Sequence, residues 1–209
     1  MNVPNFCLLD NPLVKNKVSL LRDKGCTCDN FRKLATELSD FLCYEACKDV
    51  KMIPYKLETP LEETDGVRFP PVAFVSILRA GLGMLSGALR CIPEASVGHI
   101  GMFRNEETLE PVKYYCKLPK NMHESVVFVM DPMLATGGSA CDAIAEIKKE
   151  GAKDIRFLCL IAAPEGVQKL YKNHPDVKIY ASSLDRELNS KGYILPGLGD
   201  AGDRVFNTV

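Results

Sequence analysis

The chain has 209 residues, of which 46% are hydrophobic and 25% charged, and its formal net charge is −1. A chain of this length forms one domain, or one domain with a modest appendage, around a substantial core. Both signs of charge are interspersed, which disfavours a nucleic-acid binder that depends on bulk charge, and the apolar runs are too short to cross a membrane. The first residues lack an apolar segment behind a basic start, so we expect no signal peptide and a cytoplasmic location.

Nine cysteines are spread along the chain, and their number is odd. The pairs Cys26/Cys28 and Cys43/Cys47 suggest zinc ligands, but neither pair has the usual two-residue gap and no histidine lies near either. We therefore expect reduced thiols that pack as small apolar side chains, without a metal or a disulfide.

The first third of the chain precedes the regular part of the pattern. Residues 1–28 lack clean periodicity and carry turn residues, so we expect an arm that wraps around the domain. Asp29 or Asn30 can cap a helix that runs to about Val50 with an apolar stripe on one face. Residues 51–70 alternate weakly and end in the turn-rich segment EETDG, which predicts short strands or a hairpin.

From residue 71 onward, apolar strands alternate with helices. The predicted strands are Pro71–Leu78, Ala95–Met102, Val112–Leu118 as a projecting strand, Val126–Met130, Asp154–Ala163 and Val177–Leu184. Helices are expected up to about Arg90, between residues 139 and 151, and over Pro164–Lys172. This alternation predicts an α/β fold, a parallel β-sheet flanked by helices on both faces, with ligands bound at the carboxyl ends of its strands.

The stretch 124–151 combines a strand, an acid, a glycine turn and a helix. Val126–Met130 is typical of a buried parallel strand, Asp131 follows it, and Thr136–Ser139 leads into the helix. Backbone N–H groups at a helix start bind phosphate, and a carboxylate nearby suits sugar hydroxyls, so we predict a sugar-phosphate site. The alternative, a tight turn without a ligand, leaves the acid at the end of a buried strand unexplained.

Two glycine motifs and two arginines outside this stretch are further candidates for ligand binding. Gly81–Gly83 and Gly197–Gly202 resemble parts of a dinucleotide fingerprint, but the first lacks its third glycine and the second has too few residues after it for a helix and a strand. Arg79 and Arg104 follow apolar strands, so we expect them to contact an anion, since arginine binds phosphate through two parallel hydrogen bonds. The alternative for each arginine is a solvated surface charge.

Several blocks together resemble a known family. The segments SILRAGLGM, GMFRNEETLEPV, DPMLATGGS, AAPEG, HPDV and GYILPGLGDAGDRVFNT occur in this order up to the end of the chain. They are similar to the uracil phosphoribosyltransferases, which are type I phosphoribosyltransferases that use 5-phosphoribosyl 1-diphosphate (PRPP). Pro132 stands where other type I members carry a second acid, a replacement typical of the uracil-specific members. Ser76 stands where the family pattern leads us to expect proline.

The resemblance implies the reaction of uracil with PRPP to give UMP and diphosphate in pyrimidine salvage, with Mg²⁺ carried by PRPP. It implies one phosphoribosyltransferase domain over 1–209. Its parts are an N-terminal arm, helix and hairpin over 1–70, an α/β core over 71–185 and a uracil-binding hood over 186–209. It also makes GTP a candidate effector and favours a homodimer or a larger homo-oligomer, with no nucleic acid and no membrane as partners.

The resemblance also assigns site residues. PRPP binding is expected at Arg79, Arg104, Asp131, Pro132, Met133, Leu134, Ala135, Thr136, Gly137, Gly138, Ser139 and Asp200. Uracil binding is expected at Tyr193, Ile194, Gly199, Asp200 and Ala201. Catalytic roles fall to Arg79, Arg104, Asp131 and Asp200, with no side-chain metal site and Mg²⁺ expected near Asp200. The second hypothesis is a regulator that senses PRPP or UMP through a retained phosphoribosyl pocket.

Overall fold

The computed structural model describes residues 3–104 and 111–208. In these ranges a central sheet has the strand order β1-β10-β9-β7-β4-β5-β6, and the short β8 pairs with β9. The strands are β1 (Phe6–Leu8), β4 (Val72–Leu78), β5 (Ser96–Arg104), β6 (Pro111–Lys117), β7 (Val126–Met130), β8 (Met133–Leu134), β9 (Asp154–Ala162) and β10 (Lys178–Leu184). Every pairing in this sheet is parallel except that of β5 with β6. The predicted α/β class is confirmed.

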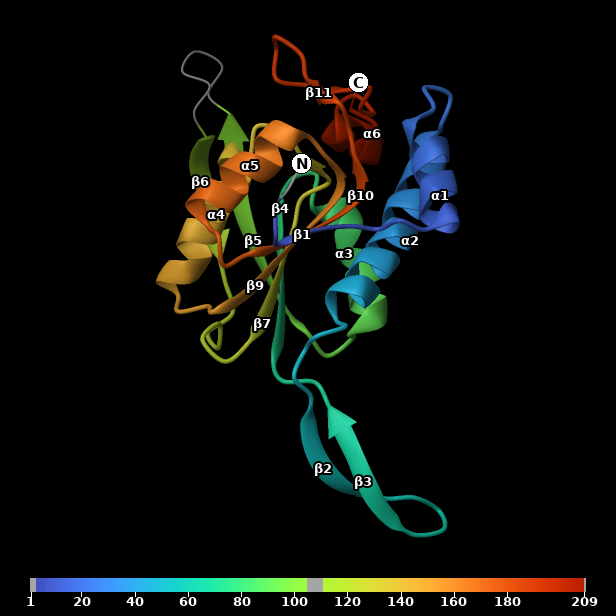
Figure 1. Ribbon diagram of the computed structural model, residues 1–209, viewed down its shortest axis with the longest axis vertical. Helices are drawn as coiled ribbons and strands as arrows, with labels where there is room; N and C mark the ends of the chain where they lie inside the picture. Colours follow the sequence, from blue (N-terminus) through green and yellow to red (C-terminus); the bar gives the residue numbers. More distant parts are fainter. Residues whose placement is uncertain (1–2, 105–110, 209) are drawn as a thin grey trace.

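Helices cover both faces of the sheet (Figure 1). One face packs against α2 (Cys28–Ala46) and α3 (Leu82–Cys91), and the other against α4 (Gly138–Lys149) and α5 (Pro164–Asn173). Since both faces are covered, the central strands are apolar throughout, and every residue of β7 is buried. None of the helices in the described part of the chain is long and apolar enough to span a membrane.

The N-terminal segment, expected as an arm that wraps around the domain, contains a strand and a helix. Strand β1 pairs with β10 at the sheet edge, and α1 (Pro12–Arg22) follows it. The side chain of Asn11 accepts a hydrogen bond from the N–H of Leu13 at 2.8 Å, and proline occupies the first helical position. Asparagine and proline are also common in turns, so the sequence did not indicate a helix here. In this order they form a favourable helix start.

Helix α2 begins and ends earlier than predicted. Its N-cap is Thr27, so Asp29 lies in the first turn, where a negative charge interacts favourably with the helix dipole. The helix ends at Ala46, and the expected extension to Val50 is wrong because residues 47–49 form a turn.

The predicted hairpin is present over β2 (Ile53–Glu58) and β3 (Glu63–Arg68), and it extends away from the body of the protein (Figure 1). Its turn lies at residues 59–62, where the hydroxyl of Thr59 accepts hydrogen bonds from two backbone N–H groups. The segment EETDG therefore belongs largely to β3 and not to a turn. Strand β6 was expected to project, but it pairs with β5 and extends the sheet.

Candidate functional site

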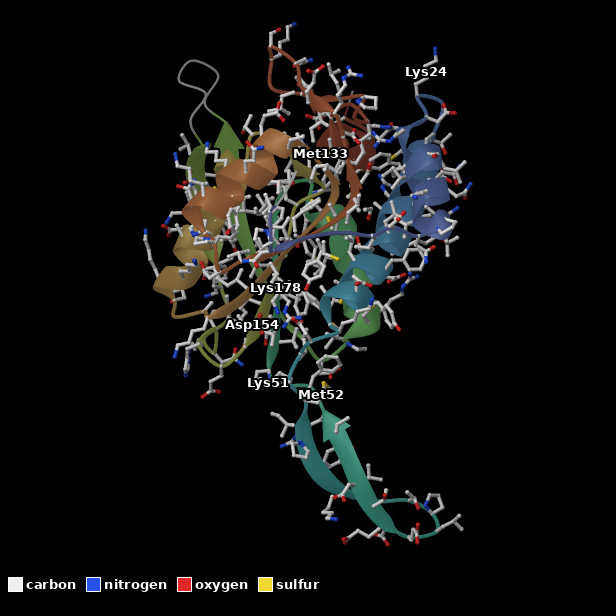
Figure 2. All side chains as sticks on the ribbon, viewed as in Figure 1. Lys24, Lys51, Met52, Met133, Asp154 and Lys178 are labelled. Atoms are coloured by element: carbon white, nitrogen blue, oxygen red, sulfur yellow. The ribbon has the colours of Figure 1, made fainter. Side chains whose placement is uncertain are left out.

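A cavity of about 430 Å³ lies at the carboxyl ends of the central strands. Its lining comes from the β4 end, the loop after β7, and the C-terminal segment 186–208, which we call the hood. The hood contains β11 (Glu187–Leu188), β12 (Ile194–Leu195) and α6 (Ala201–Phe206). In Figure 2, Met133 marks this end of the sheet, and the hairpin lies at the opposite end. The cavity is lined by Ala80, Asp131, Met133, Ala135, Lys191, Gly192, Tyr193, Ile194, Gly199, Asp200, Ala201 and Gly202.

The loop between β7 and α4 ends in an uncapped helix start. Gly137 has φ of 75°, a left-handed conformation that favours glycine, and no side chain caps α4. Gly137 also packs against α5, since a Cβ there would lie 2.9 Å from the carbonyl oxygen of Gly166. The N–H groups of the first turn have no partner within the helix, so this end of α4 is chemically suited to an anion. Thr136 and Ser139 flank this turn and are partly exposed.

Not every predicted residue of this loop faces the cavity. Pro132 is buried, and its carbonyl accepts hydrogen bonds from the N–H groups of Leu160 and Ile161 at 3.0 Å. Leu134 is also buried, and its carbonyl accepts one from Ala163 at 2.9 Å. These two positions hold the loop against β9, and their neighbours Met133 and Ala135 reach the cavity.

Asp131 is the carboxylate of the cavity floor. It directly follows β7, and its carboxylate accepts a hydrogen bond from the backbone N–H of Met133. Burial raises the pKa of the Asp131 carboxyl to about 7, because the charged form loses hydration, and the hydrogen bond from Met133 opposes this shift. A positive charge in the cavity would therefore favour ionisation of this group.

Arg79 follows β4 at the edge of the cavity. Its guanidinium lies 3.4 Å from the carboxylate of Asp203 and 5.7 Å from the centre of the Phe206 ring. The loop after Arg79 packs closely on the end of β7, since a Cβ on Gly81 would lie 2.5 Å from the carbonyl oxygen of Met130. Only glycine fits there, and this packing holds the arginine loop and the Asp131 loop side by side.

Arg104 ends β5, where its backbone pairs with Pro111 of β6. The carboxyl end of this strand lies at the same edge of the sheet as those of β4 and β7. The side chain of Arg104 lies outside the described residues, so its expected anion contact stays a prediction.

The hood is tied to the body at its base. Asp185 is buried and accepts hydrogen bonds from Arg22 and from the backbone N–H of Gly197, each at 2.7–2.8 Å. These contacts hold the pKa of the Asp185 carboxyl below its usual range in spite of burial. Arg204 of α6 donates to the carbonyls of Leu198 and Asp23 at 2.9 and 2.6 Å.

Sequence reasoning missed α6 and part of the lining. The carboxylate of Asp200 caps α6 by accepting a hydrogen bond from the N–H of Asp203 at 2.9 Å. An acid three residues before another polar residue is a helix-start signal, but the surrounding glycines obscured it. Ala80, Lys191, Gly192 and Gly202 line the cavity and were not predicted, because their proximity depends on the tertiary fold.

The structure thus gathers all five residues predicted for uracil and four of those predicted for PRPP around one cavity. The residues predicted for uracil are Tyr193, Ile194, Gly199, Asp200 and Ala201. Those predicted for PRPP are Asp131, Met133, Ala135 and Asp200, which belongs to both sets. Within residues 3–104 and 111–208, no three histidine, cysteine or acidic side chains are arranged to hold a metal ion, and all nine cysteines are free thiols.

Comparisons with known proteins match nearly the whole chain. The family model for uracil phosphoribosyltransferase matches residues 8–208. The chain is 51% identical over 205 residues to a uracil phosphoribosyltransferase from Pediococcus pentosaceus, covering 97% of this chain and 98% of the relative. It is 52% identical over 202 residues to one from Clostridium botulinum, covering 96% and 97%.

Solved structures show the same fold. A protein from Aquifex aeolicus is similar with a TM-score of 0.92 and 40% identity, covering 96% of this chain and 97% of that one. An adenine phosphoribosyl transferase from Trypanosoma brucei has a TM-score of 0.60 at 14% identity, covering 94% of this chain and 88% of that one. The second likeness concerns the fold alone.

Proposed function

The chain belongs to the uracil phosphoribosyltransferase family, and on this premise we propose that it transfers the phosphoribosyl group of PRPP to uracil. The products are UMP and diphosphate, so the protein is a pentosyltransferase of pyrimidine salvage. The observation that carries the proposal is one cavity bounded by an uncapped helix start, a partly buried carboxylate and a glycine-rich hood.

The loop over Ala135–Ser139 is proposed to hold the 5′-phosphate. The left-handed Gly137 turns the chain so that the first N–H groups of α4 are available to phosphate oxygens. The hydroxyls of Thr136 and Ser139 add two donors at the same turn. The helix dipole contributes on the order of 0.3–2 kcal/mol for a charge at this position.

Asp131 is proposed to accept hydrogen bonds from the ribose hydroxyls. Its ionised form also stabilises the positive charge that develops on the ribose ring as C1 separates from diphosphate. The raised pKa of Asp131 in the unliganded protein fits this role. Its carboxylate has no positive partner among the described residues of the free protein and gains one when positive charge develops on the ribose.

Arg79 and Arg104 are proposed to bind the diphosphate, whose negative charge increases as it leaves. Asp200 is proposed to face the Mg²⁺–PRPP complex. The donors around the cavity fit Mg²⁺, because carboxylate oxygens are ligands that it accepts, and in the described residues too few acids converge to hold it without the oxygens of PRPP. When bound, Mg²⁺ would neutralise part of the diphosphate charge.

The hood is proposed to recognise uracil through main-chain groups of Ile194, Gly199 and Ala201, with Tyr193 at its rim. Gly199 has φ of 80° and no atom within 4 Å of the position of a Cβ, so its backbone is open to the cavity. A fixed N–H donor facing O4 of uracil would reject cytosine, which presents an amino donor at that position. We infer that positioning and charge stabilisation supply most of the rate acceleration, since no described side chain is an evident base for N1 of uracil.

We also propose a homo-oligomer, a cytoplasmic location and GTP as an effector. The oligomer is supported by the hairpin, which exposes Tyr55, Leu61 and Val67 on a two-stranded ribbon that is marginally stable alone. GTP is supported by the family resemblance alone. Light scattering of the purified protein and activity measured with and without GTP test these two points.

The direct test of the activity incubates the purified protein with labelled uracil and Mg²⁺–PRPP. Formation of labelled UMP that requires both substrates is the expected result, and no UMP under any condition would refute the proposal. The relatives carry the name of the transferase, so the comparisons do not favour the alternative of a nucleotide-sensing regulator. RNA binding that depends on salt and responds to UMP would favour that alternative.

A further inference from the structure

The guanidinium of Arg79 is held by two side chains of α6 in the hood. Its Nη2 atom lies 3.4 Å from Oδ1 of Asp203, and its Cζ lies 5.7 Å from the centre of the Phe206 ring. The acid and the ring come from the same helix and both lie near the guanidinium, so together they restrict where it can lie. Asp203 itself is not one of the residues that line the cavity.

The carboxylate of Asp203 is itself fixed by its surroundings. Its Oδ1 accepts a hydrogen bond from the hydroxyl of Thr208 at 2.7 Å. Its backbone N–H donates to the carboxylate of Asp200 at 2.9 Å, and its carbonyl accepts from the N–H of Thr208 at 3.2 Å. This local network defines where the carboxylate can meet the arginine.

Helix α6 is also fixed relative to the body of the protein. Its Val205 packs against α3 so closely that a Cβ on Gly83 would lie 2.9 Å from a Val205 methyl group. The side chain of Arg32 on α2 donates to the Val205 carbonyl at 2.7 Å, and Arg204 donates to the carbonyl of Asp23. The position of Asp203 on α6 is therefore fixed relative to the loop after β4.

We propose that Asp203 is a positioning residue that orders Arg79 for the diphosphate end of PRPP, which rests on the proposed function of the cavity. The contact with Asp203 uses one amino group, and arginine has five N–H donors, so others remain for an anion. The guanidinium borders the cavity, because a Cβ on the lining residue Gly202 would lie 4.0 Å from its Nη2. Ordering the side chain before binding lowers the entropy cost of capturing the diphosphate.

The first test replaces Asp203 with asparagine, which keeps the size and removes the charge. Since an exposed ion pair contributes up to about 1 kcal/mol, we expect the Kd for Mg²⁺–diphosphate and the KM for PRPP to rise roughly fivefold. The KM for uracil and the Tm should stay unchanged, and Asp203→Glu should restore part of the affinity. The matched control is Glu187→Gln, which removes another exposed ion pair of the hood, that with Arg186 at 3.0 Å, and should change none of these values.

A double-variant cycle separates positioning from a structural role. If Asp203 acts through Arg79, the variant Arg79→Ala/Asp203→Asn binds diphosphate as Arg79→Ala does, because the partner is already absent. Additive losses would overturn the proposal, as would tighter diphosphate binding by Asp203→Asn, which would mean that the acid competes with the ligand. A wild-type protein that makes no UMP but shows the non-additive pattern would refute the proposed function and leave the positioning role intact.

Discussion

The two ends of the central sheet both carry arginine and acidic side chains, but these groups are partnered differently. At the amino ends, Arg156 of β9 is 1% exposed and lies 3.0 Å from Asp154 and 2.7 Å from Asp49. In Figure 2, Asp154 and Lys178 mark this region, and Lys178 also pairs with Asp49. At the carboxyl ends, the side chain of Arg79 is 57% exposed and has the longer 3.4 Å pair.

Asp49 and Asp131, one acid from each end, differ in the same way. The hydrogen bond from Lys178 and the guanidinium of Arg156 hold the pKa of the Asp49 carboxyl below its usual range, whereas burial without a cation raises that of Asp131 to about 7. The charged groups that stabilise the amino ends are paired with one another, whereas Asp131, which we propose to bind the substrate, has no cation beside it in the described part of the chain. Substitutions at the two ends should therefore have different effects on catalysis and on stability.

The substitution Asp131→Ala should lower kcat/KM at least about 100-fold, the effect expected when an electrostatic group at the reacting centre is removed. The fold should persist, because no described residue forms an ion pair with Asp131. Steady-state kinetics with PRPP and uracil measure the effect. The matched control is Asp154→Asn at the amino end, and near-normal turnover of Asp131→Ala would remove this acid from the site.

The substitution Arg156→Met should reverse this pattern, with a loss of stability and normal catalysis. Arg156 also donates to the carbonyl of Ala46, so its removal takes a donor from that carbonyl and from Asp154, and leaves Asp49 with Lys178 alone. We expect the free energy of unfolding to fall by about 3 kcal/mol, as when a buried ion pair is broken. Denaturant unfolding measures the loss. A large change in kcat of the folded fraction would contradict a purely structural role.

The substitution Gly137→Ala should cost about 1–2 kcal/mol of stability, because alanine is strained at φ of 75°, and should also raise the KM for PRPP. Gly151→Ala is the matched control, since Gly151 has φ of 86° at the opposite end of α4. Both variants should unfold at a lower temperature. An equal change of KM in both would show that the loop conformation has no special relation to phosphate.

The pH dependence of stability should report on Asp131. The pKa of Asp131 is about 7 in the folded protein and about 4 in the unfolded chain. Between these two values the folded state binds more protons than the unfolded state, so stability falls as the pH rises from about 4 to about 7. Asparagine mimics the neutral acid. Asp131→Asn should therefore match the wild type near pH 4 and exceed its Tm above pH 7, by about 2 °C or more. Equal Tm values at pH 8 would contradict the raised pKa.

The fold was largely predictable because its strands are continuous apolar runs, which only a sheet covered on both faces explains. The run 126–130 and the glycine turn after it also indicated the strand and the helix start between which we propose a phosphate loop. The helix after Asn11 was missed because a cap and a turn use the same residue types. In α6, the cap by Asp200 was hidden among glycines.

The candidate site was predictable only where one segment supplies several groups. The loop after β7 and the hood could each be recognised alone, but the identity of the base came from family resemblance. The contact between Arg79 and Asp203 joins residues 124 positions apart, and no local pattern indicates it. Lys191 likewise reaches the cavity only through the path of the hood.

Hydrogen–deuterium exchange with and without UMP tests most directly whether the carboxyl ends of the strands form the site. We expect slower exchange of backbone amides over residues 131–141 and 192–202 when UMP is bound. No change is expected around Asp49, Asp154 and Arg156, where the charged groups are already paired. Protection confined to the amino ends, or no protection at saturating UMP, would show that the site lies elsewhere.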